Sequence, residues 1–219
     1  LQDTIALGNL GSIFSGDLRI LAGAVKAGRT PGGDLLGPVT TLYVAADNHK
    51  SGDFTPYLFA STDLGRTWRS MAGDLPSGAI VWAVQQDHVR PELFFAGTER
   101  GLFVTVDRGA HWVELGGLPT APFRDVKLHR RDNDLVGATF GRGVFVLDDY
   151  TPLRAFVAGA APLAEDGALF PVRDAWWFVP WQPGQAPGRP EKGSDDFTTP
   201  NPPHGALFSL RFDHLFNCL

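Results

Sequence analysis

The sequence is poor in the residues that build disulfide, metal and membrane frameworks. Among its 219 residues Cys218 is the only cysteine, which excludes a disulfide framework and a cysteine metal cluster and leaves the redox compartment open. No stretch approaches the roughly 18 consecutive apolar residues that a membrane helix needs. The first 15 residues lack the basic start and apolar run of a signal peptide. We therefore expect no membrane span.

Positive charge is also scarce. Lys and Arg total 19 against 24 Asp and Glu, a formal net charge of -5, without the basic face that nucleic-acid binding leaves in a sequence. Nucleic acid is therefore not an expected partner. The chain begins at Leu1 without a methionine, and we expect it to be a piece of a longer protein, so that a missing signal peptide says little about export.

Helical periodicity is absent, and turn residues are plentiful. The 26 Gly and 17 Pro separate short runs rich in Val, Phe, Leu and Tyr, a pattern typical of strands. No window among these runs shows a sustained 3.6-residue period. We predict an all-β protein with little helix. The predicted strands are 41–46, 57–61, 80–85, 93–97, 101–106, 124–128, 134–139 and 143–147.

The chain also contains an internal repeat. STDLGRTW at 61–68 returns 44 residues later as TVDRGAHW at 105–112, and the segment 91–107 resembles 132–149, where the repeat ends without a tryptophan. A period of about 40–45 residues with four short strands per unit is typical of propeller blades. We predict a β-propeller fragment of about three four-stranded blades.

Each residue of the repeated motif suits a tight hairpin turn. An aspartate accepts hydrogen bonds from turn N–H groups, a glycine tolerates the left-handed conformation, and hydroxyl groups add further bonds. A tryptophan packs between the hairpin and its neighbour. We therefore interpret the motif as structural. Its residues are Ser61, Asp63, Gly65, Thr67 and Trp68 in the first copy, and Thr105, Asp107, Gly109 and Trp112 in the second.

The motif S-x-D-x-G-x-T-W resembles the Asp-box of the BNR repeat, found in sialidases, sortilin-type propellers and tandem-propeller xyloglucanases. The chain resembles above all the large bacterial BNR or sortilin-like propeller proteins often labelled glycosyl hydrolase. The resemblance covers roughly residues 39–208 and rests on DFTPYLFASTDLGRTW, RPELFFAGTERGLFVTVDRGAHW, DNDLVGATFGRGVFVLDDYTPLR and NPPHGALF. It implies the last blades of a propeller in an extracytoplasmic protein. In the second copy His111 and Thr105 stand where threonine and serine are usual.

The resemblance and the composition divide the chain into segments. We expect an unmatched N-terminal segment or partial blade at 1–38, BNR/Asp-box blades at 39–155, a docking tail at 156–180, a Pro/Gly-rich linker at 181–204 and a truncated start of a following β domain at 205–219. Trp176, Trp177, Phe178 and Trp181 form an aromatic cluster that could stack on a sugar but more often docks a tail onto its own domain. Three blades do not close a ring, so we expect open sheet edges and aggregation of the isolated chain.

No catalytic set can be assigned. Glycoside hydrolysis needs two carboxyl groups that flank the bond, and a sialidase, as the resemblance implies, adds an arginine triad and a tyrosine paired with a glutamate. The tyrosines are Tyr43, Tyr57 and Tyr150, all in or just after strand-like runs, and no arginine triad can be assigned. Asp148 and Asp149 are neighbours that point to opposite faces of a strand. We interpret one of them as a remnant of the motif aspartate.

Metal and cofactor sites are not expected either. His49, His88, His111 and His129 lack the spacing of a zinc site. The loop 47–53 offers Asp47, His49 and Asp53 for a cation or a sugar, but we interpret it as a solvated loop between strands.

Propellers bind ligands at the central channel and the loops of one face, whereas the motif hairpin lies at the periphery. We select Trp82, Arg124 and Arg142 as ligand-binding candidates, with turn closure or an ion pair to Asp148 as the alternative role of Arg142. The expected partner is a peptide, protein or glycan. The predicted function is a protein- or glycan-binding or scaffold module of a larger extracytoplasmic bacterial protein. The alternative is a sialidase- or xyloglucanase-like glycoside hydrolase whose catalytic carboxylates lie on blades outside this chain.

Overall fold

Strands account for almost all the regular structure. The computed structural model describes residues 17–19, 41–63, 65–157, 167–175 and 205–212. These residues contain strands and the short 3-10 helices η1 (His49–Ser51) and η2 (Thr151–Phe156), but no α-helix, which confirms the prediction of an all-β protein. The linker 181–204, the aromatic cluster at 176–181 and most of 1–38 lie outside the described residues. The chain divides into two compact units, Leu1–Ala161 and Pro162–Leu219.

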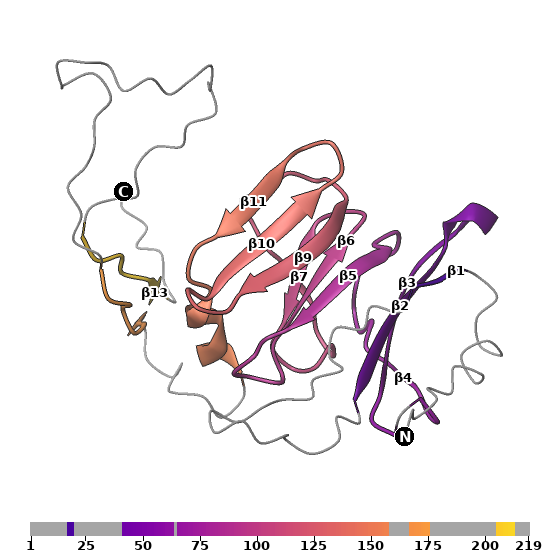
Figure 1. The fold of residues 1–219 in the computed structure, drawn as a ribbon, viewed down its shortest axis with the longest axis horizontal. Helices are drawn as coiled ribbons and strands as arrows, with labels where there is room; N and C mark the ends of the chain where they lie inside the picture. The colour runs from indigo at the N-terminus through magenta and orange to yellow at the C-terminus, as the bar shows by residue number, and fades with distance from the viewer. Residues whose placement is uncertain (1–16, 20–40, 64, 158–166, 176–204, 213–219) are drawn as a thin grey trace, which may run out of the picture. The chain divides into compact units, whose positions relative to one another are not determined.

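Three antiparallel meanders form the first unit (Figure 1), and we call them blades 1, 2 and 3. Blade 1 contains β1 (Asp17–Arg19), β2 (Leu42–Asn48), β3 (Asp53–Ser61) and β4 (Arg69–Ser70). Blade 2 contains β5 (Val81–Gln86), β6 (Phe94–Thr98), β7 (Leu102–Thr105) and β8 (Val113–Glu114). Blade 3 contains β9 (Phe123–His129), β10 (Asp134–Thr139) and β11 (Val144–Leu147). Because consecutive strands are neighbours in each sheet, the predicted β-propeller fragment is confirmed.

Every predicted strand overlaps a strand of the structure, and the strands that the sequence did not reveal are short. β4 and β8 have two residues each, too few for an apolar alternation. Pairing holds them in place, with Phe59 opposite Ser70 and Phe103 opposite Glu114. Blade 3 differs from the expected four strands, because after β11 the described chain turns into η2.

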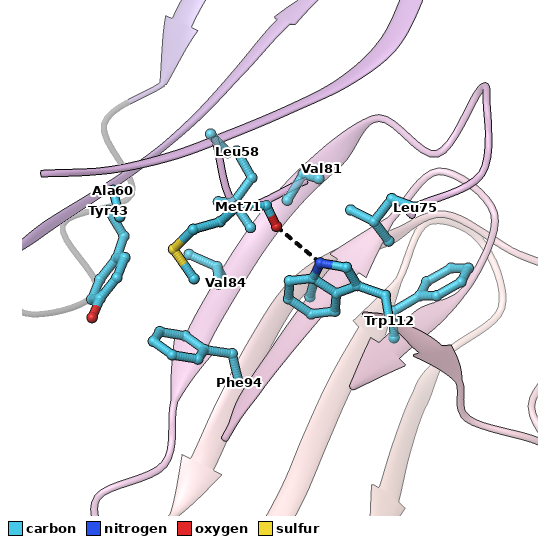
Figure 2. Packing of buried hydrophobic residues seen from close by; sticks show 12 residues of the cluster. Tyr43, Leu58, Ala60, Met71, Leu75, Val81, Val84, Phe94 and Trp112 are labelled. Atoms are coloured by element: carbon cyan, nitrogen blue, oxygen red, sulfur yellow. Dashed lines mark hydrogen bonds between the residues drawn. The ribbon is translucent and has the colours of Figure 1, made fainter. Parts of the chain in front are cut away.

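Blade 2 is buried on both faces because its side chains alternate between two cores. One core joins it to blade 1, as Figure 2 shows around Leu58, Phe94 and Trp112. The other core joins it to blade 3 through Phe95 and Phe123. Phe94 and Phe95 are neighbours in β6 and therefore point to opposite faces. Both are 1% exposed or less.

The contact between blades 1 and 2 includes a close approach of two backbone segments. The indole Nε1 of Trp112 donates to the carbonyl of Met71 at 2.9 Å (Figure 2). Gly109 has φ +85, and a Cβ there would lie 2.5 Å from the same carbonyl oxygen. Gly73 has φ +49, and a Cβ there would lie 2.4 Å from the carbonyl of Gly109. Only glycines allow the two segments to lie this close.

The second unit contains a small antiparallel pair. β12 (Gly167–Leu169) pairs with β13 (Leu210–Phe212), and the N–H of Phe170 donates to the carbonyl of Ser209 at 3.1 Å. Within the described parts of the chain, no helix is long and apolar enough to cross a bilayer.

The first prediction concerns aggregation through the edge strand β11. Val144 on this strand is 63% exposed, and an open edge with apolar side chains is a template for pairing with other chains. We expect Val144→Lys to raise the soluble fraction of the chain with little change in thermal stability. The matched control is Val89→Lys, because Val89 is 53% exposed but lies in a loop. Light scattering would measure aggregation, and an equal effect of both substitutions would contradict an edge-driven process.

A second prediction concerns the glycine at the junction of blades 1 and 2. In Gly109→Ala the new side chain must adopt a left-handed backbone and also clashes with the Met71 carbonyl. Gly117→Ala is the matched control, because Gly117 has φ +78 but nothing lies within 4 Å of its Cβ position, so only the backbone is strained. We expect Gly117→Ala to cost about 1 kcal/mol of unfolding free energy and Gly109→Ala about 1–3 kcal/mol more. Urea denaturation would measure both, and equal costs would show that the junction can open without penalty.

Candidate functional site

The first copy of the repeated motif closes the turn between β3 and β4. The N–H of Gly65 donates to Ser61 Oγ at 2.8 Å, and this hydroxyl donates to Asp63 Oδ1 at 2.8 Å. Asp63 also accepts from the hydroxyl of Thr67 at 2.7 Å and from its N–H at 2.8 Å. These bonds, first from the Thr67 hydroxyl, lower the pKa of Asp63 to about 2. Trp68 is half-buried, and its Nε1 donates to the carbonyl of Gly65 at 3.0 Å.

The second copy repeats this geometry between β7 and β8. The N–H of Gly109 donates to Thr105 Oγ1 at 3.0 Å, and this hydroxyl donates to Asp107 Oδ1 at 2.8 Å. The ring of His111 takes the place of the threonine hydroxyl, with Nδ1 2.6 Å from Asp107 Oδ2. Burial raises the pKa of Asp107, but bonds from the backbone and ring of His111 outweigh it and hold the pKa at about 2. Both aspartates are used to close turns.

The third copy of the repeat uses a different closure. Leu147 stands where Thr105 carries a hydroxyl, and Asp149 occupies the position of Asp107. Asp149 has φ +52, and its Oδ1 accepts from the N–H and the hydroxyl of Thr151 at 3.2 and 2.6 Å. The aspartate therefore bonds to the first residue of the 3-10 helix η2.

Two of the ligand-binding candidates lie at β-bulges in equivalent places. In β5 the register shifts between Val81 and Ala83, so Trp82 is the extra residue. In β9 Phe123 lies opposite Thr139 and Asp125 opposite Ala138, so Arg124 is the extra residue. A bulge interrupts pairing and re-aims the side chain, a device common beside functional sites. Both bulges lie at the start of the first strand of a blade.

The two bulged side chains form a stack. Arg124 Cζ lies 3.7 Å from the centroid of the Trp82 ring, within the range of a cation–π interaction. Trp82 Nε1 donates to Glu99 Oε2 at 2.7 Å, and Arg124 Nη2 lies 3.6 Å from the same oxygen. The ring of His49 from blade 1 lies edge-on to Trp82 at 5.7 Å, and Arg124 lies 5.9 Å from the ring centroid of Phe140. Residues of all three blades therefore meet here.

A threonine fixes the turn beside each bulge. Thr98 Oγ1 donates to the carbonyl of Gly101 at 2.9 Å and accepts from the N–H of Arg100 at 3.1 Å. Thr139 Oγ1 donates to Gly143 at 2.7 Å and accepts from Arg142 at 3.2 Å. We call the end of the blades formed by these residues the turn face. It consists of His49, Lys50, Trp82, Thr98, Glu99, Arg100, Arg124, Thr139, Phe140 and Arg142.

The structure brings Trp82 and Arg124 into contact and places Arg142 in the neighbouring turn. Arg142 is exposed, and its guanidinium makes no ion pair with Asp148 or with another residue of the described ranges. Its backbone N–H takes part in turn closure. The side chain of Arg142 is therefore available to a ligand.

The segment 47–53 differs from the predicted solvated loop, because it contains the end of β2, the 3-10 helix η1 and the start of β3. Asp47 is 3% exposed, and one of its oxygens accepts a hydrogen bond from the ring of His49. Asp53 accepts from the N–H of Thr55 at 3.0 Å and from the hydroxyl of Tyr57 at 2.8 Å. Hydrogen bonds, first from the N–H of Thr55, lower the pKa of Asp53. These carboxylates therefore order the loop.

One group has the composition of a metal site. Ligand atoms of His129, Asp132 and Asp134 lie within 4.8 Å of one another in the turn between β9 and β10. Arg131 Nε donates to Asp132 Oδ1 at 3.2 Å, and Arg131 Nη2 donates to Oδ2 at 2.9 Å. Asp134 Oδ1 accepts from the N–H of Asp149 at 3.0 Å. The carboxylates are thus engaged by the turn itself.

A second buried aspartate lies at the end of the blades opposite the turn face. Asp87, which is 3% exposed, accepts from Arg154 Nε and Nη2 at 2.8 Å each and from the Tyr150 hydroxyl at 2.7 Å. Burial raises the pKa of Asp87, but bonds from Arg154, the N–H of Arg90 and Tyr150 outweigh it and hold the pKa at about 2. Burial and Asp87 raise the pKa of Tyr150. Arg154 also donates to Asn133 at 2.8 Å. This fully bonded network joins blade 2 to blade 3.

Sequence reasoning missed both Glu99 and Phe140 in the turn face and the network around Asp87. The first pair could have been found by aligning Thr98–Gly101 with Thr139–Gly143, which share a threonine, an arginine and a glycine. The network around Asp87 could not be found from a single sequence, because 67 residues separate Asp87 from Arg154.

Comparison with known proteins gives limited likenesses. No protein-family model and no curated protein matches the sequence. The chain is similar to the GH74 enzyme of Niastella koreensis, with a TM-score of 0.41, 18% identity, and coverage of 52% of this chain and 18% of that chain. The GH74 xyloglucanase of Xanthomonas campestris gives a TM-score of 0.36 at 18% identity, with coverage of 50% of this chain and 20% of that chain. An ancestral GH74 enzyme gives a TM-score of 0.36 at 18% identity, with coverage of 46% of this chain and 15% of that chain. The chain spans a fifth or less of each of these proteins.

The class of the fold rests on the three meanders, their strand order and the cores between them. The chain is an all-β fragment of the β-propeller class. Membership of the BNR/Asp-box family stays a prediction.

The buried network leads to a prediction with a pH dependence. The folded-state pKa of Asp87 is about 2, below the ordinary 3.8, so its stabilisation is present above about pH 4 and is lost as the pH falls towards about 2. We expect Asp87→Asn to lower the unfolding free energy at neutral pH by about 3–5 kcal/mol. The variant should also lose less stability than the unmodified chain as the pH falls from about 4 to about 2.

The matched control is Asp125→Asn. Asp125 is 3.2 Å from Lys127 in an exposed ion pair, so its loss should cost less than about 1 kcal/mol. Thermal unfolding followed between pH 2 and 7 would measure both variants. A similar cost for the two would show that the buried network does not hold blades 2 and 3 together.

Proposed function

We propose that the chain belongs to a BNR/Asp-box propeller and serves as a protein- or glycan-binding or scaffold module of a larger extracytoplasmic bacterial protein. In this proposal residues 39–155 form the blades, and the chain continues through a docking tail at 156–180 and a linker at 181–204 into a further β domain that starts at 205–219. The hydrogen-bonded turns at Asp63 and Asp107 support the family assignment.

The stack of Arg124 on Trp82 is the observation that carries the binding function. It lies where strand ends and turns of three blades meet, which is where propellers bind ligands. The side chain of Arg124 is 40% exposed although it is held by Trp82 and Glu99. A guanidinium that is both fixed and accessible can bind a ligand without losing much conformational entropy.

The described turn face favours binding over hydrolysis. A glycosidase needs two carboxyl groups that flank the scissile bond, one of which donates a proton. At this face Glu99 is engaged by Trp82 and Arg124, and Asp47 is buried against His49. Both carboxylates therefore support neighbouring side chains. A hydrolase would take its carboxylates from other blades.

Binding assays on the full chain would test the proposal. Immobilised protein would be exposed to xyloglucan, to polygalacturonate and to a peptide library. We expect at least one ligand to be retained, and Arg124→Ala to weaken its affinity about tenfold or more, as expected for an anchoring arginine.

Lys127→Ala is the matched control, because Lys127 is an exposed cation on the same strand, with a side chain 66% exposed. Its affinity should equal that of the unmodified chain. Retention of none of the probes, or equal losses for the two variants, would contradict a binding role for the turn face. Release of reducing ends from xyloglucan would instead indicate a hydrolase.

A further inference from the structure

We propose that the outer edge of blade 3 binds an extended peptide strand of another protein, which pairs with β11 and places an aromatic side chain in a cavity beside it. The cavity and this edge share no side chain with the stack of Trp82, Glu99 and Arg124. The inference is therefore independent of the binding function proposed for the turn face.

The cavity lies between blades 2 and 3, and its walls are apolar. Its volume is about 200 Å³, and no charged side chain lines it. A cavity of about 150 Å³ with apolar walls is large enough to bind benzene, so this one can hold an aromatic ring. The lining includes Leu102, Leu115, Leu118, Leu135, Phe145 and Leu147.

The cavity corresponds to the place that Trp112 occupies at the junction of blades 1 and 2. The N–H of Met71 donates to the carbonyl of Leu58 at 2.8 Å. The N–H of Leu115 makes the same bond to Leu102, also at 2.8 Å, so these two pairs are equivalent. Trp112 packs in one core with Leu58 and Met71 (Figure 2), whereas their equivalents line the cavity. Two more cavity residues have counterparts in that core by their place in the repeat: Leu118 matches Leu75, and Phe145 matches Phe103.

The edge of β11 beside the cavity pairs with no other strand of the described residues. In blade 2 the same edge of the third strand is covered by β8, and Phe103 is 4% exposed in the core that contains Trp112. Phe145 takes the place of Phe103 in blade 3 and is only half-buried. Tyr150 at this junction packs on Phe95 and does not line the cavity. The edge and the cavity therefore present an apolar surface to a further strand.

The outer strands of blades 1 and 2 show which peptide fits this surface. Each follows a tryptophan directly and is followed by an apolar residue, in the sequences WRSM at 68–71 and WVEL at 112–115. In both, the N–H of the apolar residue donates to the third strand. A peptide with this aromatic-x-x-apolar pattern would pair antiparallel with β11. Its aromatic ring would enter the cavity, and the N–H of its apolar residue would donate to the carbonyl of Val144, the counterpart of Leu102.

Opposite charges at the two ends of β11 favour one direction for the peptide. Arg142 precedes the strand and Asp148 follows it, and both side chains are exposed. In blade 2 Glu114 lies against Gly101, where a Cβ would be 2.8 Å from its Oε1. Gly143 has the position of Gly101 and follows Arg142 directly. An acidic residue after the aromatic would therefore lie near Arg142, and a basic residue before it would lie near Asp148.

The described residues of the chain, and of a second copy, offer no strand of this kind. The two matching strands, β4 and β8, already pair with β3 and β7. The β11 strand of a second copy would bring Phe145, which already packs on Phe123 with the ring centroids 6.0 Å apart. The occupant is therefore a strand of another protein, and strand addition to a sheet edge is a common mode of peptide recognition.

Titration of the full chain with a synthetic copy of residues 110–116, AHWVELG, tests the proposal. We expect the peptide to bind, and Trp112→Ala in the peptide to raise Kd about tenfold or more, because the cavity is then left unfilled. N-methylation of the peptide at Leu115 should raise Kd about tenfold, because it removes the N–H that pairs with the edge. N-methylation at Glu114 is the matched control, since the N–H groups of neighbouring residues point to opposite sides of a strand.

Substitutions in the chain test where the peptide binds. Leu147 lines the cavity and is 43% exposed, so Leu147→Asp should keep the fold and raise Kd about tenfold or more by placing a charge in the cavity. Val113→Asp is the matched control, because Val113 is 65% exposed on β8 and does not line the cavity. Its Kd should equal that of the unmodified chain, and so should the Kd of Arg124→Ala. Thermal unfolding would verify that all three variants are folded.

Each contrary result has a separate meaning. Absence of peptide binding, or no effect of Trp112→Ala and of N-methylation at Leu115, would overturn the inference and leave the turn face untouched. Peptide binding that is lost in Arg124→Ala but kept in Leu147→Asp would overturn it in favour of the turn face. Dimerisation that Leu147→Asp prevents, without peptide binding, would overturn it in favour of a second copy. Peptide binding that appears only after Trp176→Ala and Trp177→Ala would overturn it in favour of the chain's own residues 176–179.

Discussion

The backbone contact between the second motif and the exit of blade 1 is the constraint on which the arrangement of the turn face depends. Gly109 lies against the carbonyl of Met71, and Trp112 donates to that same carbonyl at 2.9 Å. This contact fixes blade 1 against blade 2 at the motif end. Because each blade is a hydrogen-bonded sheet, the opposite ends are fixed as well, and His49 of blade 1 then lies beside Trp82 of blade 2.

Blades 2 and 3 are held against each other by different interactions from those between blades 1 and 2. The third repeat has no tryptophan, and Tyr150 packs at this junction instead, with its ring 5.1 Å from Phe95 and its hydroxyl on Asp87. Arg154 then neutralises the buried aspartate. A buried charge is tolerated only when all its hydrogen bonds are made, and within the described residues no buried side-chain polar atom lacks a partner. The loss of the motif in blade 3 is therefore offset by the network.

The sequence predicted the parts of the structure that depend on local pattern and on repetition. Short apolar runs between turn residues located the long strands, and the copy of 61–68 at 105–112 revealed the blade period. It could not locate β8, whose two residues are held by pairing with β7 alone. It also could not link Asp87 with Arg154, because that pair depends on the packing of one blade on the next. Trp82 and Arg124 were selected as channel-side residues, but their direct stacking follows from two bulges that no pattern indicates.

The two ends of the blades thus carry different constraints. At the motif end the side chains of Asp63 and Asp107 complete the backbone turns, so their identity is set by folding. At the turn face the hydroxyls of Thr98 and Thr139 and the bonds to the preceding strand already satisfy the backbone. The adjacent positions are then free to differ, and they do, with Glu99 in one blade and Phe140 in the next. Variation of side chains on an unchanged backbone is what a binding surface needs, so the least repetitive positions of the repeat are the ones suited to select a ligand.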